Sequence, residues 1–348
     1  MPSRAAKTNR EAAIIDETLI KRIIAFYETS AASSSIAGKS QWSGFLKNFN
    51  LAIHNTLLKR ESKTVSQALS NPAQNNLFYG FENIRIDYTR ACKENKNNTC
   101  QWHAEQIHDG LLSLAEAVGV VPISNPEAPN LKPFHLDAET LLNKLDERFE
   151  FRIDFPNPYP DEFGLETKRG VAGYRAIHAL WQAWRIQSQL SDPPSSHVLE
   201  IGAGLGRTAY YAKKFNIGSY AIVDIPFTAI SSAHFLMTMF GPHEMHLFGE
   251  PKNNASIQIM PPQAFFESHE RFDLIVNFDS FTEIDRTMAG LYWKHIFKLS
   301  EVFLSINHEV NPFRVADFYM GPDKQYKVER FPCWLRKGYV EELVRLRK

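Results

Sequence analysis

Short apolar runs alternate with helix-length segments through the second half of the chain. The runs cover residues 198–201, 220–223, 257–260, 274–278 and 302–306. Strands that are joined by helical crossovers run parallel, so this pattern predicts an α/β fold with a doubly wound, Rossmann-like sheet. Residues 327–331 and 339–346 fit an antiparallel pair at the edge of that sheet, although the second run fits a helix equally well.

Residues 1–153 have a different pattern, in which apolar residues recur at helical spacing. These stripes lie at residues 15–26, 42–57, 107–118 and 141–149. Such stripes are typical of helices that bury one face. Proline interrupts helices and central strands, so one of the two proline-rich stretches, at 121–133 or at 154–164, marks the domain boundary. We predict a mainly helical region over residues 1–153, forming a lid or substrate wall, and a sheet domain over residues 154–348.

Charge, hydropathy and cysteine content limit the functions open to this chain. Lysine plus arginine total 39 and aspartate plus glutamate total 39 in 348 residues, so no overall charge attracts nucleic acid or an anionic membrane. No apolar run reaches the roughly 20 residues of a membrane-spanning helix, and the first residues lack the apolar stretch of a signal peptide. The three cysteines are scattered, as is typical of reduced thiols. We expect a cytoplasmic protein that binds neither nucleic acid nor membrane.

A glycine-rich segment follows the first predicted strand. In HVLEIGAGLGRTAYYAKKF, Gly202, Gly204 and Gly206 lie between that strand and a predicted helix. This arrangement brings backbone N–H groups and a helix N-terminus against a bound ligand. A dinucleotide-binding turn has glycine or alanine where this chain has Arg207, so the segment is not typical of NAD binding.

Two acidic residues accompany this turn. Glu200 lies two residues before Gly202, where a carboxylate would face the positively charged end of a ligand and would repel a pyrophosphate. Asp224 ends the second predicted strand, and a carboxylate there can accept hydrogen bonds from both hydroxyls of a ribose. The acids and the glycines therefore agree on a nucleoside ligand that carries positive charge.

With these motifs the chain resembles the class I methyltransferases that depend on S-adenosylmethionine (SAM). VLEIGAGLG is similar to their glycine-rich first motif, and AIVDIP is similar to their acidic second motif. The resemblance implies that SAM is the cofactor, that Asp224 holds its ribose and that Ile225 packs on its adenine. It also implies contacts to the methionine part from Gly202, Ala203, Gly204 and Gly206. The third motif, IQIMPPQAFF, lacks the polar residue that many members place near the adenine.

The ends of the fourth and fifth predicted strands are unusually polar. NFDSFTEID presents Asp279 and Glu283, and SINHEVN presents His308 and Glu309. Ligands of doubly wound sheets bind beyond the carboxyl ends of the strands, so these four are the candidate catalytic residues. We predict that His308 takes the proton of an acceptor hydroxyl, because an imidazole suits a general base near neutral pH.

The same carboxylates allow two other interpretations. Asp279 or Glu283 could instead cap the helix that begins near residue 287. Asp279, Glu283 or Glu309 could also hold Mg²⁺, which would acidify the acceptor hydroxyl. Their spacing does not indicate a divalent cation, so the sequence leaves metal dependence open.

A closer resemblance concerns the acceptor. The segments RGVAGYRAIHALWQAWRI, NFDSFTEI and SINHEVNPF together are similar to a bacterial family of sugar O-methyltransferases, and NLFYGFENI fits its helical N-terminal part. The resemblance implies methyl transfer to a hydroxyl of a sugar or glycan, including a nucleotide sugar. Two alternatives stay open, a small metabolite other than a sugar as acceptor and a SAM-type fold without activity. The oligomeric state also stays open.

Overall fold

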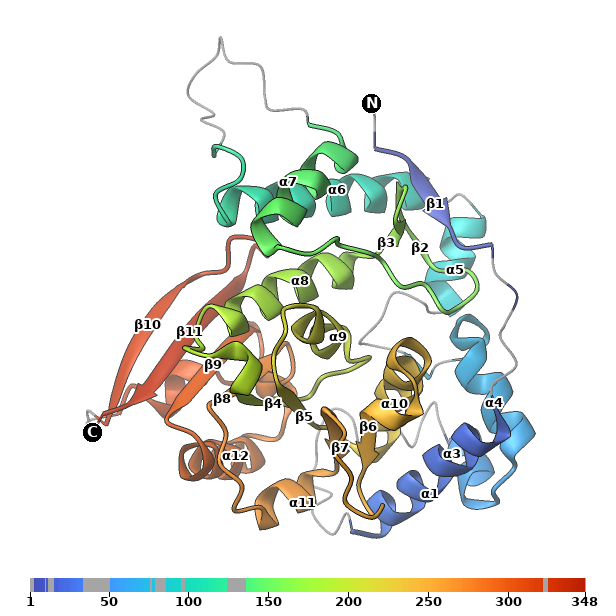
Figure 1. The fold of residues 1–348 in the computed structure, drawn as a ribbon, viewed down its shortest axis with the longest axis vertical. Helices are drawn as coiled ribbons and strands as arrows, with labels where there is room; N and C mark the ends of the chain where they lie inside the picture. The colour runs from blue at the N-terminus through green and yellow to red at the C-terminus, as the bar shows by residue number, and fades with distance from the viewer. Residues whose placement is uncertain are drawn as a thin grey trace.

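The computed structural model describes residues 3–9, 11, 16–33, 51–75, 77–78, 86–94, 98–123, 136–321 and 325–347. Its main element is an eight-stranded sheet of order β10-β11-β9-β8-β4-β5-β7-β6 (Figure 1). The strands are β4 (His197–Ile201), β5 (Ser219–Val223), β6 (Met245–Leu247), β7 (Ile257–Met260), β8 (Leu274–Phe278), β9 (Val302–His308), β10 (Tyr326–Pro332) and β11 (Tyr339–Leu346). All pairings are parallel except those of β11, which runs antiparallel to both β9 and β10.

The predicted fold class is confirmed, because the five predicted strands are β4, β5, β7, β8 and β9 of a doubly wound sheet. The run at 339–346 is a strand rather than a helix, and it forms the predicted antiparallel pair with β10 at the edge of the sheet. The three residues of β6 were not predicted, since so short a run carries no periodicity.

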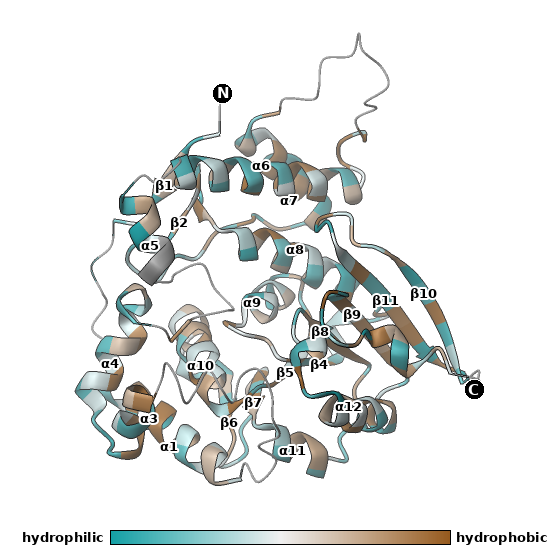
Figure 2. Ribbon diagram, turned by 180° about the vertical axis from the view of Figure 1, so that it is seen from behind, coloured by the Kyte–Doolittle hydropathy of each residue, from teal (hydrophilic) through white to brown (hydrophobic). Residues whose placement is uncertain are grey.

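Helices cover both faces of this sheet. One face carries α8 (Tyr174–Gln187), α9 (Arg207–Lys214) and α10 (Pro226–Phe240), and the other carries α11 (Pro262–Glu267) and α12 (Arg286–Leu299) (Figure 1). Alternate strand residues enter different cores, as Val198 of β4 packs with the first group of helices and Leu199 with the second. Figure 2 shows the apolar residues of β9 and β11, which are buried through their central parts.

The N-terminal region is mainly helical. Its helices are α1 (Glu17–Ser33), α3 (Leu51–Leu58), α4 (Ser62–Ser70), α5 (Ile86–Lys93), α6 (Thr99–Ala117) and α7 (Ala138–Phe149). The predicted apolar stripes of α6 and α7 are buried, as the helical spacing requires. The stripe at 42–49 and the segment at 76–84 fall wholly or largely outside the described residues.

These helices pack on the helical layer of the sheet domain. Helix α6 lies against α8, and α1 lies against α10 (Figure 1). A small second sheet joins β1 (Ala5–Lys7) to β2 (Phe163–Thr167) and β2 to β3 (Gly170–Ala172), so it crosses the predicted boundary at residue 154. One hydrophobic core runs from α1 through α6 and α8 into the sheet. The boundary itself stays a prediction.

The cysteines correct one expectation. Cys92 and Cys100 form a disulfide whose Cα atoms are 5.3 Å apart, whereas Cys333 is free and buried. The expectation of reduced thiols is therefore wrong for this pair. The sequence spacing hid the pairing because it depends on the end of α5 meeting the start of α6.

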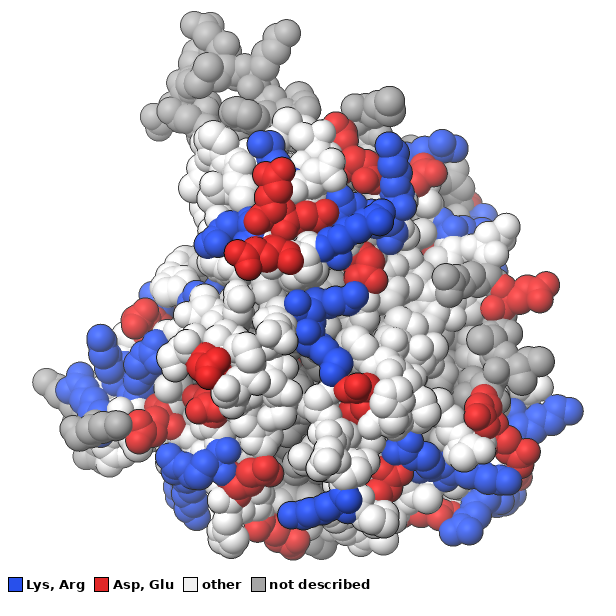
Figure 3. Space-filling model, viewed as in Figure 1, with Lys and Arg blue, Asp and Glu red and all other residues white. Residues whose placement is uncertain are grey.

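The surface carries charges of both signs. Figure 3 shows lysine and arginine side chains interspersed with aspartate and glutamate over the face in view. Among the described helices, none combines the length and the apolar composition that crossing a bilayer requires.

The shared core predicts that a cavity in the N-terminal region weakens the whole protein. Leu111 of α6 is fully buried, so Leu111→Ala should lower the free energy of unfolding by about 2–5 kcal/mol. Denaturant unfolding followed by circular dichroism measures this change. Leu58→Ala is the matched control, because Leu58 is 50% exposed, and it should change stability by less than about 0.5 kcal/mol. A separate transition for the N-terminal helices alone would contradict the shared core.

Candidate functional site

The strand order reverses at β4, and this reversal creates a crevice. The chain passes from β4 to β5 on one side and later returns to β8 on the other side of β4. In such sheets the crevice lies beyond the carboxyl ends of the strands at the reversal. Four loops meet there, after β4, β5, β8 and β9. The amino end of β11 joins them, because this strand runs antiparallel and Tyr339 pairs with His308.

The turn after β4 needs glycine for two reasons. Gly202, Gly204 and Gly206 all have positive φ angles, of 75°, 59° and 85°. A Cβ on Gly202 would lie 2.0 Å from the Oγ of Ser280, which follows β8. Gly202, Ala203 and Gly204 are half-buried, so their backbone is open to a ligand. Gly206 is the N-cap of α9, as the sequence predicted for a turn that leads into a helix.

Asp224 follows β5 directly and faces this turn. Its Oδ2 accepts a hydrogen bond from the Gly204 N–H at 3.1 Å, and its Oδ1 accepts one from the Ile225 N–H at 2.8 Å. A carboxylate offers about four acceptor positions, so each oxygen keeps capacity for a further donor. Burial raises the pKa of Asp224 to about 7, although the two backbone hydrogen bonds oppose the shift. Ile225 is half-buried beside it.

Glu200 lies within β4 and is almost completely buried. The hydroxyl of Tyr220 on β5 donates to its Oε2 at 2.9 Å. Burial raises the pKa of Glu200 to about 8, and the charges of Asp224 and Asp279 add to this effect. The carboxyl is therefore largely neutral at pH 7 in this structure. The predicted role, facing the positive end of a cofactor, stays a prediction.

The loop after β8 is held by an amide network. Asn277 donates to the Ile201 carbonyl at 2.8 Å and to Ser280 Oγ at 2.7 Å. Asn307 of β9 donates to the Asn277 Oδ1 at 2.8 Å. These bonds join the ends of β4, β8 and β9, and they fix the position from which the loop starts.

Asp279 is engaged by two arginines. It has a positive φ of 70°, which is uncommon for a residue with a side chain, and it pairs with Arg175 of α8 and with Arg336. Burial raises the pKa of Asp279, but the charges and hydrogen bonds of Arg336 and Arg175 outweigh it, so the net shift is downward. Asp279 therefore stays ionised in its ion pairs with the two arginines, and it is a poor proton acceptor.

The other three candidate residues lie in different surroundings. His308 ends β9, its ring packs edge-on against Tyr339 at 5.3 Å, and its buried Nδ1 has no hydrogen-bond partner among the described residues. Glu309 pairs with Arg330 of β10 at 2.9 Å. Glu283 is half-buried in the single turn η5 (Phe281–Glu283). Asp285 caps α12, so neither Asp279 nor Glu283 does.

Metal ligands are not gathered in the part of the chain that the structure describes. No three His, Cys, Asp or Glu side chains there lie close enough together to hold a metal ion. Asp279 and Glu309 instead pair with different arginines.

Several residues of the crevice were not predicted. Tyr174, Arg175 and His178 belong to the first turns of α8, whose sequence supported the resemblance above but offered none of them as a site residue. Arg336 and Tyr339 precede or begin β11, and they reach the crevice only because this strand is antiparallel and lies beside β9. The first turn of α8 is polar and aromatic whereas the rest of the helix is apolar, and this contrast could have indicated site residues there. No sequence pattern places Arg336.

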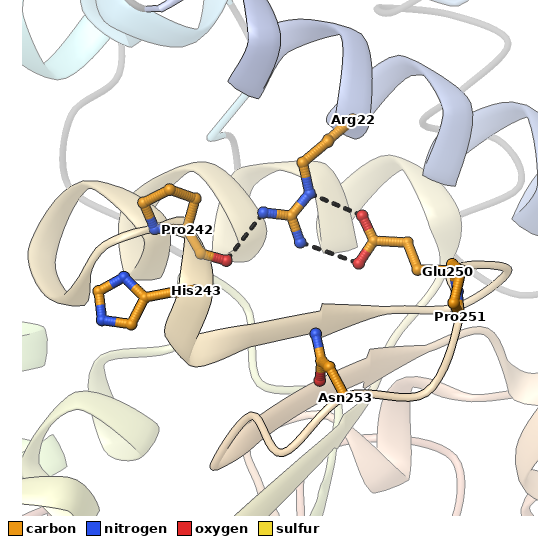
Figure 4. A pocket seen from close by; sticks show the side chains of 6 residues that line it. All are labelled: Arg22, Pro242, His243, Glu250, Pro251 and Asn253. Carbon is orange, nitrogen blue, oxygen red and sulfur yellow. Dashed lines mark hydrogen bonds and ion pairs between the residues drawn. The ribbon is translucent and has the colours of Figure 1, made fainter.

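A separate hollow lies at the other edge of the sheet. Its volume is about 450 Å³, and Figure 4 shows its lining residues Arg22, Pro242, His243, Glu250, Pro251 and Asn253. Arg22 of α1 donates to the Glu250 carboxylate at 2.6 and 2.9 Å and to the Pro242 carbonyl at 2.8 Å. These bonds join α1 to the segments on either side of β6. The hollow is therefore a surface depression where these elements pack together.

Comparison with known proteins finds similarity among solved structures. No protein-family model and no curated protein matches the chain. The chain is similar to magnesium protoporphyrin IX methyltransferase from Synechocystis PCC 6803, at 12% identity and a TM-score of 0.37 over 51% of this chain and 86% of that one. It is also similar to mitomycin 7-O-methyltransferase, at 12% identity and a TM-score of 0.35 over 49% of this chain and 55% of that one. The strand order and the register of the pairings define the doubly wound fold independently of these matches.

The raised pKa of Glu200 predicts a pH-dependent stability. The folded-state pKa of about 8 lies above the ordinary value of 4.5, so the contribution of this carboxyl is complete below about pH 4.5 and is lost as the pH rises through about 8. Glu200→Gln keeps an acceptor for Tyr220 and does not ionise. We expect its melting temperature to match that of the wild type at pH 5 and to exceed it by about 3 °C or more at pH 9.

Thermal unfolding of the ligand-free protein between pH 5 and pH 9 measures this difference. Glu329→Gln, an exposed position on β10, should leave the pH profile unchanged. Parallel profiles for the wild type and Glu200→Gln would show that Glu200 is ionised throughout this range.

Proposed function

We propose that this protein is a SAM-dependent methyltransferase that transfers a methyl group to a hydroxyl of a sugar or glycan. One observation carries the proposal: at the point where the strand order reverses, an all-positive-φ glycine turn lies against a buried carboxylate on the next strand. The two are joined directly by the hydrogen bond from Gly204 to Asp224. Neither a tight turn nor a solvated surface acid requires this combination.

The residues of the crevice fit SAM. Gly202, Ala203 and Gly204 offer an open backbone on which the methionine part of SAM can lie. The free acceptor capacity of Asp224 suits the two ribose hydroxyls, and Ile225 lies next to it for apolar contact with the adenine. Burial holds a proton on Glu200, and the positive charge of SAM would favour its ionised form. When bound, SAM supplies a methyl group on a positively charged sulfur.

The acceptor side lies at the ends of β8, β9 and β11. Here the chain positions a hydroxyl in line with the donor, and such positioning contributes several kcal/mol to catalysis. His308 takes the proton of that hydroxyl, and Tyr339 holds its ring in place. Asp279 orients the two arginines that bind it, and Glu283 orients the acceptor. Glu309 acts through its ion pair with Arg330.

The N-terminal region is the wall of this site in our proposal. Its helix α6 packs on α8, the helix that supplies Tyr174, Arg175 and His178. Anchoring α8 from outside fixes the side chains that α8 directs at the crevice. The region therefore supports catalysis by fixing the position of α8.

An acceptor screen tests the proposal. The protein is incubated with unlabelled SAM and a panel of sugars, glycans, nucleotide sugars, phenols and carboxylic acids, and mass spectrometry detects a gain of 14 Da, the mass of one added methylene. Methylated sugars support the proposal. Methylation confined to phenols or acids would favour a small-metabolite enzyme, and a protein that does not bind SAM would be a non-catalytic fold.

Asp224 provides a direct test of cofactor binding. Asp224→Asn removes a charged acceptor from the ribose hydroxyls, so we expect SAM affinity to fall about 10- to 100-fold. Isothermal titration calorimetry measures the dissociation constant. Asp273→Asn is the control, because Asp273 accepts from the His197 N–H at the amino end of the strands, away from the crevice. Unchanged SAM affinity in Asp224→Asn would remove the basis of the cofactor assignment.

His308 provides the test of acid–base chemistry. His308→Ala should lower turnover about 10²- to 10⁴-fold and leave SAM affinity nearly unchanged, because the imidazole acts on the acceptor. Turnover is measured on the acceptor that the wild type methylates. His243→Ala is the control, since His243 is exposed at the opposite edge of the sheet. Wild-type turnover in His308→Ala, together with loss of activity in EDTA, would replace the histidine mechanism with a metal mechanism.

A further inference from the structure

Five side chains form a compact group on the acceptor side of the crevice, which we call the arginine cluster: Arg175, His178, Asp279, Arg336 and Tyr339. Both arginines pair with Asp279. The guanidinium carbon of Arg336 lies 3.5 Å from the centre of the Tyr339 ring. His178 completes the group beneath Tyr174, whose ring is 4.1 Å from its own. These residues come from α8, from the loop after β8 and from the segment at the start of β11. The fold therefore brings three separate elements together at one location.

The arginine cluster is built around one carboxylate, that of Asp279, which pairs with both guanidinium groups. His178 adds no charge, because burial and then the charges of Arg336 and Arg175 hold its pKa well below the ordinary value. A buried guanidinium group is costly when its hydrogen bonds are incomplete, unless a ligand or partner completes them.

Arg336 is the residue whose bonding is incomplete. Its side chain is 7% exposed, and its buried Nε has no hydrogen-bond partner among the described residues. The buried Nδ1 of His178 also lacks a partner there. Buried polar atoms are nearly always paired in folded proteins, so two unpaired atoms in one cluster point to a missing ligand. A guanidinium N–H requires an acceptor, and a phosphate or carboxylate is the acceptor that matches its geometry best.

We propose that the arginine cluster binds an anionic group of the acceptor, with Arg336 as its main contact. The acceptor is then a sugar that carries a phosphate or a carboxylate. This inference rests on the proposed function and narrows its substrate class.

The position of the cluster suits this role. The Tyr339 ring contacts both the Arg336 guanidinium and the His308 ring, whose centre is 5.3 Å away. An anion held at Arg336 therefore brings a neighbouring hydroxyl of the same molecule toward His308. Asp224 and the glycine turn lie at the ends of β5 and β4, whereas Arg336 and Tyr339 lie just before and at the start of β11, beyond β8 and β9 in the sheet.

Binding of three related probes tests the inference. Glucose 1-phosphate, glucuronate and glucose share one ring and differ in charge, and each is titrated by calorimetry into protein saturated with S-adenosylhomocysteine. We expect at least one anion to bind tenfold or more tightly than glucose. The tighter of the two anions identifies phosphate or carboxylate as the recognised group. Equal weak binding of all three probes would overturn the inference.

Variants locate the effect. Arg336→Gln should weaken binding of the preferred anion tenfold or more, and Arg336→Lys should weaken it less because it keeps the charge. Lys337→Gln is the matched control, since it removes the same charge from the next, exposed position and should bind as the wild type does. If Arg336→Gln and Lys337→Gln lose the same affinity for the anion, the attraction is a non-specific effect of positive charge. That result would overturn the inference.

Two further measurements, the melting temperature and the SAM affinity, separate failure of this inference from failure of the proposed function. The melting temperature of each variant shows whether it is folded. If Arg336→Gln does not fold, Arg336→Lys still tests the inference. SAM affinity is measured separately on each variant. Wild-type SAM affinity with no preference for anions overturns the acceptor class alone, whereas absent SAM binding overturns the proposed function itself.

Discussion

Asn277 is the residue on which the crevice depends. Its side chain is completely buried at the reversal of strand order, and its amide makes four hydrogen bonds, to Ile201, Ser280, Phe281 and Asn307. An asparagine amide has two N–H donors and a carbonyl with two acceptor positions, so every bonding position is used. These bonds hold the ends of β4, β8 and β9 at fixed separations. The glycine turn, the Asp279 loop and His308 all begin from those three ends.

The two buried acids of the crevice show how a candidate binding site opposes stability. Glu200 and Asp224 are buried, no lysine or arginine of the described residues forms an ion pair with either, and burial raises the pKa of each well above its ordinary value. A core of apolar residues at the same places would avoid this cost. Perturbed acids of this kind gather at functional sites, because a bound ligand completes their environment.

Much of the fold and half of the site could be predicted from the sequence. Strand and helix periods are local, so the five central strands and the positions of Gly202 and Asp224 were accessible from the pattern of residues. Arg336 was not, since its place depends on β11 running antiparallel beside β9, a long-range choice. The Cys92–Cys100 bond and the Asp279 ion pairs were hidden for the same reason, because each joins separate elements. Residue types showed what chemistry was present, and only topology showed which side chains meet.

The small sheet beside the helices has a consequence for the order of folding. Strand β1 pairs with β2, whose residues 163–167 lie far along the chain. During synthesis, residues 5–7 emerge early and have no strand partner until β2 has been made. Contacts of such sequence separation form slowly, because a long loop must close first. The start of the chain is therefore expected to be among the last parts to reach its native place, after α6 and α7 have already formed.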